Sequence, residues 1–399
     1  MHSRQNVGGV RLAGRNYKFL LSQSSLKMKK TLAALAVLST FAGAAFAADV
    51  TVYGLVDLGL NYVHNDDGVN DATDKFTMNS GTNSGSRFGL KGEEDLGNGI
   101  KVGFVLENGF KADDGTLDNG GRLFGRESSL YVTGAAGTLK FGRLTQMTSS
   151  TGTTGLMGST VSAFSTGWNE VRGHKTVMAG DYTQYDNTVM YSTPSFAGFQ
   201  VHAQYSFDTG VTDYKDGVEG KSSVDRYAAI GATYKAGALN LVGAIENYNY
   251  ASYPSTLTTP DDDGLTVNFG GAYDFGVAKV YAVAQYFKHM SLWLDASKIG
   301  ANTGLTNEND MQGFGINVST GIPAFGGTAK FGLGYMDAEQ CDDADMDLQR
   351  YTVSAGYEYN LSKRTMLYTG VGYTADSYGA KNADDAYTIG WVGGLVHKF

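Results

Sequence analysis

The chain has 399 residues, of which 31 are basic, 40 are acidic and one is a cysteine. The acidic balance argues against nucleic-acid binding, which depends on basic patches. A single cysteine excludes an internal disulfide and a zinc site built from several thiolates.

The start of the chain has the pattern of a secretory signal. A basic stretch at Met28 is followed by a short apolar run and by an A-x-A cleavage site that ends at Ala47. We therefore expect residues 28–47 to be a signal peptide and residues 1–27 to be an upstream extension; a retained membrane anchor is the alternative. The segment up to Ala47 holds seven basic residues and no acidic one. The remaining domain, 48–399, thus has 24 basic and 40 acidic residues, a net charge of −16.

From residue 50 onward, apolar and polar residues alternate, which is typical of strands with two unlike faces. In the first stretch, 50–63, Leu58 lies on the apolar face and Asp57 on the polar one. The last stretch, 387–399, has one aromatic and aliphatic face and ends on Phe399. We expect these two stretches to pair and close the sheet.

Short turns and long polar loops alternate between the strand-like stretches. The short joints are residues 97–99, 135–137, 195–198, 235–237, 275–276, 323–327 and 360–363. The long loops centre on residues 64–83, 112–121, 147–184, 209–223, 251–263, 291–310, 339–346 and 377–384. Together these fifteen connections join sixteen strands.

This pattern predicts an all-β fold, a transmembrane antiparallel β-barrel with short periplasmic turns and long external loops. Sixteen strands enclose a water-filled channel rather than a packed interior. The alternative is a secreted soluble propeller or solenoid. The sequence has no fixed repeat period, and Tyr and Phe gather at strand ends as membrane-interface girdles require, so the barrel is favoured.

Several motifs resemble the general porins of β-proteobacteria, including the neisserial type. They are S-R-F-G-L-K-G-E-E-D-L-G-N-G at 86–99, F-G-R-E-S-S-L-Y-V at 124–132, G-T-L-K-F-G-R-L at 137–144 and Y-D-N-T-V-M-Y-S-T-P-S-F-A-G-F at 185–199. The last six residues, G-L-V-H-K-F, resemble the ending of the same porins. The likeness covers the whole expected domain.

The resemblance implies an outer-membrane porin that passes ions and small hydrophilic solutes. It implies a homotrimer in outer-membrane lipid, with no cofactor and no nucleic-acid partner. It also makes Phe399 the expected recognition end for the outer-membrane barrel assembly machinery.

The constriction is expected from the same resemblance. In porins that resemble this chain, the third external loop folds into the barrel and narrows it, and here that loop is 147–184. Glu170 and Asp181 are the expected acidic side; the alternative is an exposed, mobile loop. Arg87 and Arg126 match the family's basic wall by motif.

Three further cations are assigned to that basic wall: Arg143, Lys91 and Lys101. A charged side chain is costly on the lipid face at mid-membrane, so a mid-strand cation is expected to point into the channel. On strict alternation, Arg126 and Arg143 share a face with apolar neighbours, which a bulge or a rim position would explain. Relatives commonly have Arg where this chain has Met190, so the preferred ion sign stays open.

Other functions have weaker support. The six histidines show no metal-site spacing, and no G-x-S-x-G motif is present. The acidic clusters at 261–263 and 342–347 lack the EF-hand pattern and are interpreted as solvated loops rather than Ca²⁺ sites. We expect no catalytic, cofactor or metal site. The alternatives are a substrate-specific channel, or a barrel enzyme or adhesin without an open pore.

Overall fold

The computed structural model describes residues 50–68, 70–149, 151–165, 168–171, 173–180, 182–212, 216–252, 262–292, 310–379 and 385–399. The expected upstream extension and signal peptide lie outside these residues. No described helix is long and apolar enough to cross a membrane.

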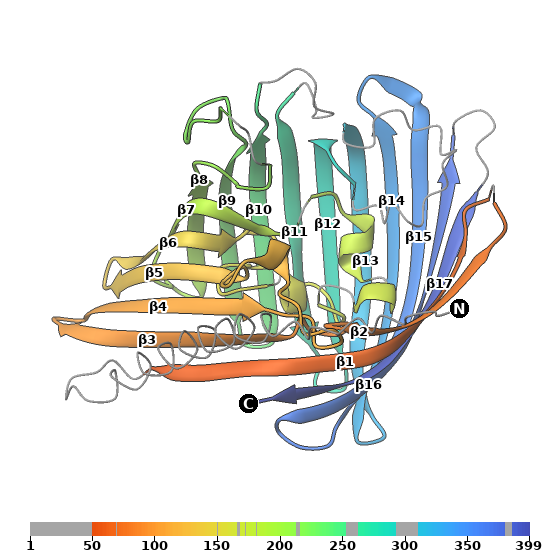
Figure 1. Cartoon of the computed structure of the whole chain (residues 1–399), viewed down its shortest axis with the longest axis horizontal. Helices are drawn as coiled ribbons and strands as arrows, with labels where there is room; N and C mark the ends of the chain where they lie inside the picture. Colours follow the sequence, from red (N-terminus) through yellow and green to blue (C-terminus); the bar gives the residue numbers. More distant parts are fainter. Residues whose placement is uncertain are drawn as a thin grey trace, which may run out of the picture. The chain divides into compact units, whose positions relative to one another are not determined.

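Seventeen strands form one antiparallel sheet in the described part of the chain (Figure 1). The first nine are β1 Thr51–Asp66, β2 Thr73–Ser80, β3 Arg87–Gly97, β4 Ile100–Gly109, β5 Glu127–Gly134, β6 Gly137–Thr145, β7 Gln184–Ser192, β8 Phe199–Ser206 and β9 Arg226–Ala236. The others are β10 Leu239–Asn249, β11 Gly264–Asp274, β12 Lys279–Met290, β13 Met311–Ala324, β14 Gly327–Gln340, β15 Asp343–Asn360, β16 Thr365–Tyr378 and β17 Ala386–Lys398. Short 3₁₀ turns occur at Asn119–Gly121 (η2), Gly158–Thr160 (η3), Asn169–Val171 (η4) and His174–Val177 (η5).

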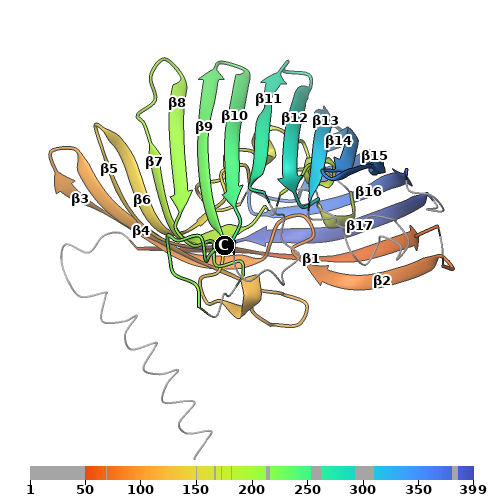
Figure 2. The same ribbon diagram turned by 90° about the horizontal axis from the view of Figure 1, so that it is seen from above.

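The sheet is a closed barrel of sixteen strand positions, as the alternation predicts. Strand β1 pairs with β2 over one half of its length and with β3 over the other, so β2 and β3 share one position that is interrupted at residues 81–86. Each remaining strand pairs with its neighbours in chain order. Figure 2 shows the sheet curving round through these strands.

Closure between the first and last strands is confirmed. The β1–β17 register runs from Leu55 opposite Lys398 to Asp66 opposite Tyr387. At the end of the chain, the Phe399 N–H donates to the Gly54 carbonyl at 3.0 Å, and the Gly54 N–H donates back at 3.3 Å.

All seven predicted short joints are turns between consecutive strands. The β3–β4 turn illustrates the local cause, because Asn98 (φ 54°) and Gly99 (φ 75°) both adopt the positive φ that a tight hairpin requires. The seven turns lie at one end of the barrel because every strand is antiparallel to its neighbours.

Two predicted long loops are wrong. Residues 73–80, expected within a polar loop, form strand β2. Backbone hydrogen bonds with β1 stabilise this strand, although its side chains alternate too weakly to predict it. Residues 339–346 contain a turn of only Cys341 and Asp342 between β14 and β15. Strand β15 has 18 residues, more than the 9–11 or so that span a bilayer, so its acidic end extends into water.

The two faces of the strands differ as a membrane barrel requires. On β13, Phe314, Ile316 and Val318 are exposed on the outer face, while Asn317 and Ser319 are buried on the inner face. Aromatic rings pair across neighbouring strands near the long-loop end, including Tyr335–Tyr351 at 4.9 Å and Tyr373–Tyr387 at 6.2 Å between centroids. These rings match the interface girdle expected of such barrels.

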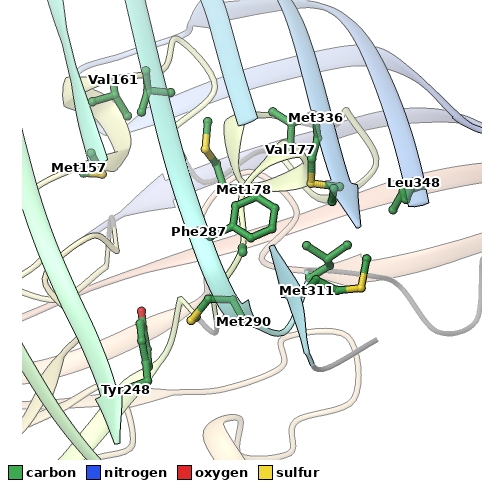
Figure 3. Packing of buried hydrophobic residues seen from close by; sticks show 14 of the residues in the cluster. Met157, Val161, Val177, Met178, Tyr248, Phe287, Met290, Met311, Met336 and Leu348 are labelled. Carbon is green, nitrogen blue, oxygen red and sulfur yellow. The ribbon is translucent and has the colours of Figure 1, made fainter. Parts of the chain in front are cut away.

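Loop L3, residues 146–183, connects β6 to β7 and packs against the inner face of the barrel. Its Met157, Val161 and Val177 join a buried apolar cluster with wall residues such as Phe287 and Met336. Figure 3 shows these side chains meeting between L3 and the strands. Apolar residues on the inner wall are therefore covered by protein rather than by channel water.

A second cluster joins L3 to the closing strands. Phe164, Trp168 and Val171 of L3 pack with Tyr368 of β16 and Val392 of β17. The rings of Phe164 and Trp168 meet edge to face at 5.4 Å.

Glycines in the wall allow L3 to approach this closely. A Cβ at Gly315 of β13 would overlap the carbonyl oxygen of Val177. A Cβ at Gly372 of β16 would lie 2.5 Å from the carbonyl oxygens of Glu170 and Val171. Because glycine has no side chain, the inner wall has room for the L3 backbone at these positions.

Candidate functional site: a channel between loop L3 and the basic wall

The interruption between β2 and β3 folds toward the buried carboxylate of Asp57. The backbone N–H groups of Asn83 and Ser84 donate to Asp57 Oδ2 at 2.7 and 2.6 Å. Tyr368 donates its hydroxyl to the other oxygen at 2.7 Å. Asp57 thereby fixes the segment that leads into Arg87.

Arg87 and Arg126 share one carboxylate, Glu107. The Arg126 Nε–H donates to Glu107 Oε1 at 2.7 Å, and the Arg87 Nε lies 3.8 Å from Oε2. Arg87 also donates to the Gly85 carbonyl at 2.9 Å, and Tyr53 donates to Glu107 Oε2 at 2.9 Å. Two guanidinium groups against one carboxylate leave an excess positive charge on this wall.

A further cation, Lys330 of β14, lies beside L3. Its ammonium contacts Glu358 at 2.5 Å and stands 4.8 Å above the ring of Trp168. Burial of Trp168 against Phe164 and Tyr368 holds the ring that Lys330 contacts. The lysine is thus positioned by both the wall and the loop.

These groups line a cleft of about 510 Å³ between L3 and the wall, which we call the basic cleft. Among the described residues that line it, four are cations and two are carboxylates: Arg87, Lys91, Arg126 and Lys330 against Glu107 and Glu358. Both carboxylates are within salt-bridge distance of a cation. Hydroxyl groups of L3, including Ser159 and Ser162, complete the lining.

A second cleft, of about 400 Å³, lies toward the short turns and shares Thr153 with the first. It is lined by Lys140 and Lys235 among others. The buried Glu127 accepts from Lys140 at 3.0 Å and from the Thr153 backbone at 2.9 Å. The two clefts therefore adjoin, with cations along both.

The first turn of L3 is held by the buried carboxylate of Glu246 on β10. Thr148 donates to it through its hydroxyl at 2.9 Å and through its backbone N–H at 3.2 Å. Three wall hydroxyls donate to the same carboxylate, from Tyr227 at 2.6 Å, Thr266 at 2.7 Å and Tyr248 at 3.1 Å. This charge is satisfied by donors from four elements, as a buried carboxylate requires.

The last part of L3 is held by a buried ion pair. Arg350 of β15 donates to both oxygens of Asp376 at 2.6 Å and to the Thr176 carbonyl of L3 at 3.1 Å. His174 is fully buried nearby, and burial, with a smaller effect from Lys175, lowers its pKa from 6.5 to about 4. L3 is therefore docked with a neutral imidazole.

Residues 33–379 match the family described as Gram-negative porin. The chain belongs to this porin family. An outer membrane porin protein of Bordetella pertussis is 34% identical over 403 residues, covering 93% of this chain and all of that protein. The protein is accordingly an outer-membrane porin, a channel and not an enzyme.

Solved structures have the same fold. The anion-selective porin from Comamonas acidovorans covers 88% of this chain and all of its own, with a TM-score of 0.61 and 24% identity. The trimer form of OmpT of Vibrio cholerae covers 88% of this chain and 99% of its own, with a TM-score of 0.58 and 17% identity.

Two of the porin's predicted basic residues lie away from the basic cleft. Lys101 is exposed near the short turns and pairs with Glu93 at 2.7 Å. Arg143 lies at a register shift between β6 and β7, where it donates to the Gly125 carbonyl at 2.8 Å and to Asp186 at 2.6 Å. The register shift turns the Arg143 side chain away from the face on which strict alternation would place it.

Of the predicted acidic side, Glu170 is not among the residues that line the basic cleft. Glu170 lies in η4, and its Cβ approaches Gly390 of β17. Asp181 lies outside the described residues. Met190 is buried in an apolar cluster with Leu144 of β6 and Met147 of L3.

Lys140 and Lys330 were missed by the sequence reasoning. Lys140 stands between the outer-face residues Leu139 and Phe141, and Lys330 directly precedes the outer-face residue Phe331. Strict alternation therefore contained the signal that would have placed them inside the barrel.

Proposed function

We propose that this porin passes small solutes through the basic cleft beside L3 and prefers anions. The observation that carries this proposal is the lining of four cations against two carboxylates that are already paired. A dissolved anion meets unbalanced positive charge there, and the low-dielectric walls strengthen its attraction. Transport is passive, with no covalent step.

The net negative charge of the chain does not oppose the preference for anions. Selectivity depends on the charges that line the narrowest part of a pore, whereas charges more than a Debye length of about 10 Å away are screened at 0.1 M salt. Acidic residues such as Asp342, in the β14–β15 turn, and Asp343, at the start of β15, lie at the long-loop end of the barrel.

The test is the reversal potential of the purified protein in a planar bilayer under a KCl gradient. We expect stepwise conductance and a potential of anion-selective sign. An Arg87→Ala, Arg126→Ala double variant should move that potential toward cation selectivity, whereas the Arg143→Ala control should leave it unchanged. A cation-selective parent protein, or an unchanged double variant, contradicts the anion preference; lack of conductance contradicts the open channel.

We also propose that the protein assembles as a homotrimer through the outer face of β16, β17, β1 and β2. Support comes from an apolar hollow of about 580 Å³ on these strands, lined by Leu58, Leu60, Met78, Leu367 and Leu395 among others. A protein surface that fills this hollow would bury the leucines against side chains instead of mobile lipid.

The oligomer can be tested by electrophoresis of unheated samples and by cross-linking. Leu60→Asn should convert the trimer to monomers, while Ile316→Asn on the outer face of β13 should leave it intact. Both changes place an amide on an exposed outer-face position, so equal loss in the two variants would contradict this contact face.

A further inference from the structure

Three side chains with metal-binding atoms meet at the long-loop end of β12 to β15. His289 lies near the end of β12, Asp310 directly precedes β13, and Cys341 lies in the β14–β15 turn. One ligand atom from each lies within 4.8 Å of the other two, and Asp310 is buried. None of the three lines either cleft.

The backbone directs these residues toward one another. The β12–β13 register shifts between Phe287 and Met290, and His289 within this bulge has a φ of 52°. A non-glycine residue with positive φ is strained, and bulges of this kind re-aim side chains. The Cys341 N–H donates to the Asp310 carbonyl at 3.0 Å, which holds the turn beside the acid.

Both nitrogens of the imidazole face carboxylates. Nδ1 of His289 is 2.7 Å from Asp310, and Nε2 is 3.5 Å from Asp262. With a metal at Nδ1, the Nε2–H remains free to donate to Asp262. Such a carboxylate partner on the second nitrogen orients metal-binding histidines in many proteins.

The thiol of Cys341 is protonated without a metal. Burial is the largest cause of a rise in its pKa from 9.0 to about 11, and the nearby Asp310 contributes to that rise. A bound divalent cation replaces the thiol proton, which is released to solvent. Lys288 lies near the cluster as a compensating cation.

We propose that His289, Asp310 and Cys341 bind a borderline or soft divalent cation of the Zn²⁺ class. Thiolate, imidazole and carboxylate are the donors zinc takes, whereas Mg²⁺ and Ca²⁺ prefer oxygen alone. Three protein ligands leave a fourth position for water. The bound ion links both ends of the β12–β13 connection to the β14–β15 turn.

Alkylation of the porin's single cysteine tests the site directly. The folded, detergent-purified protein is treated with a maleimide, with Zn²⁺, with Mg²⁺ or with a chelator, and the modified fraction is measured by mass spectrometry. We expect Zn²⁺ to slow the modification at least tenfold, the chelator to restore it, and Mg²⁺ to have no effect. Equal rates with Zn²⁺ and Mg²⁺ would overturn the proposal.

Variants separate the site from general surface binding. Cadmium is the probe, because a cadmium–thiolate bond has an ultraviolet charge-transfer band that other surface ligands lack. Cys341→Ser should abolish the band, His289→Ala should weaken Cd²⁺ binding at least tenfold, and Asp343→Asn, an exposed neighbouring acid, should change neither. Unheated electrophoresis verifies that each variant is folded. An undiminished band in folded His289→Ala would refute the ligand set.

Discussion

Replacing Glu246 with Gln should loosen the docking of L3. Gln keeps the shape of the side chain but removes the charge that Thr148 donates to twice. A hydrogen bond to a charged group contributes about 2 kcal/mol and a neutral one about 1 kcal/mol, so the two Thr148 bonds lose about 2 kcal/mol together. The new amide N–H₂ replaces one of the two oxygens and faces the hydroxyl donor there, Tyr227 at Oε1 or Thr266 at Oε2, which costs roughly 1 kcal/mol more.

The total of about 3 kcal/mol corresponds to an increase of roughly two orders of magnitude in the undocked population of L3. Single-channel recording measures this population as the time spent in conductance levels other than the main one. Glu93→Gln, a carboxylate near the short turns, is the matched control and should behave as the parent protein does. If Glu246→Gln spends no more time in secondary levels than Glu93→Gln, the carboxylate does not hold the loop.

Three further changes probe L3 and the chain end. Gly372→Val places a side chain against the Glu170 and Val171 carbonyls and should displace η4, so the main conductance should change. The control Gly321→Val, where an added Cβ meets only the Thr328 methyl group at 3.5 Å, should leave the main conductance unchanged. Since the pKa of His174 is lowered from 6.5 to about 4, the undocked loop takes up a proton first as the pH falls. The free energy that docks L3 should therefore be constant above about pH 6.5 and fall by about 3 kcal/mol between pH 6.5 and pH 4. In single-channel recordings, the time in secondary conductance levels should increase over this range in the parent protein but not in His174→Gln. Deleting Phe399 removes the two backbone hydrogen bonds with Gly54, so outer-membrane yield by cell fractionation should fall while secretion continues; normal assembly of the shortened chain would contradict the role of this residue.

The barrel itself could be predicted from the sequence because its physics is local. Alternation with period 2 places each side chain on one of two faces, and residues such as Asn98 and Gly99 mark the turns. Where this reasoning failed, pairing with another strand decided the structure. Strand β2 forms because β1 presents an unpaired ladder, and no pattern within 73–80 contains that information.

The candidate channel was predicted less completely for the same reason. Arg87 and Arg126 were placed by motif and line the basic cleft, and alternation would have added Lys140 and Lys330. Arg143 follows a register shift, which depends on the partner strand β7. The position of Glu170 depends on how L3 folds onto glycines more than 200 residues away in the chain, and that contact has no local signature.

Pairing of β1 with β17 also constrains how the chain folds. The partners are about 340 residues apart, six doublings beyond a four-residue hairpin, so closing them costs about 4 kcal/mol more chain entropy than an ordinary turn. Until that last ladder forms, both edge strands have unpaired N–H and C=O groups, and each such group costs several kcal/mol in hydrocarbon. An open sheet of this chain is therefore unstable inside a bilayer, and a folding intermediate needs either water or a temporary partner strand along those two edges until they meet.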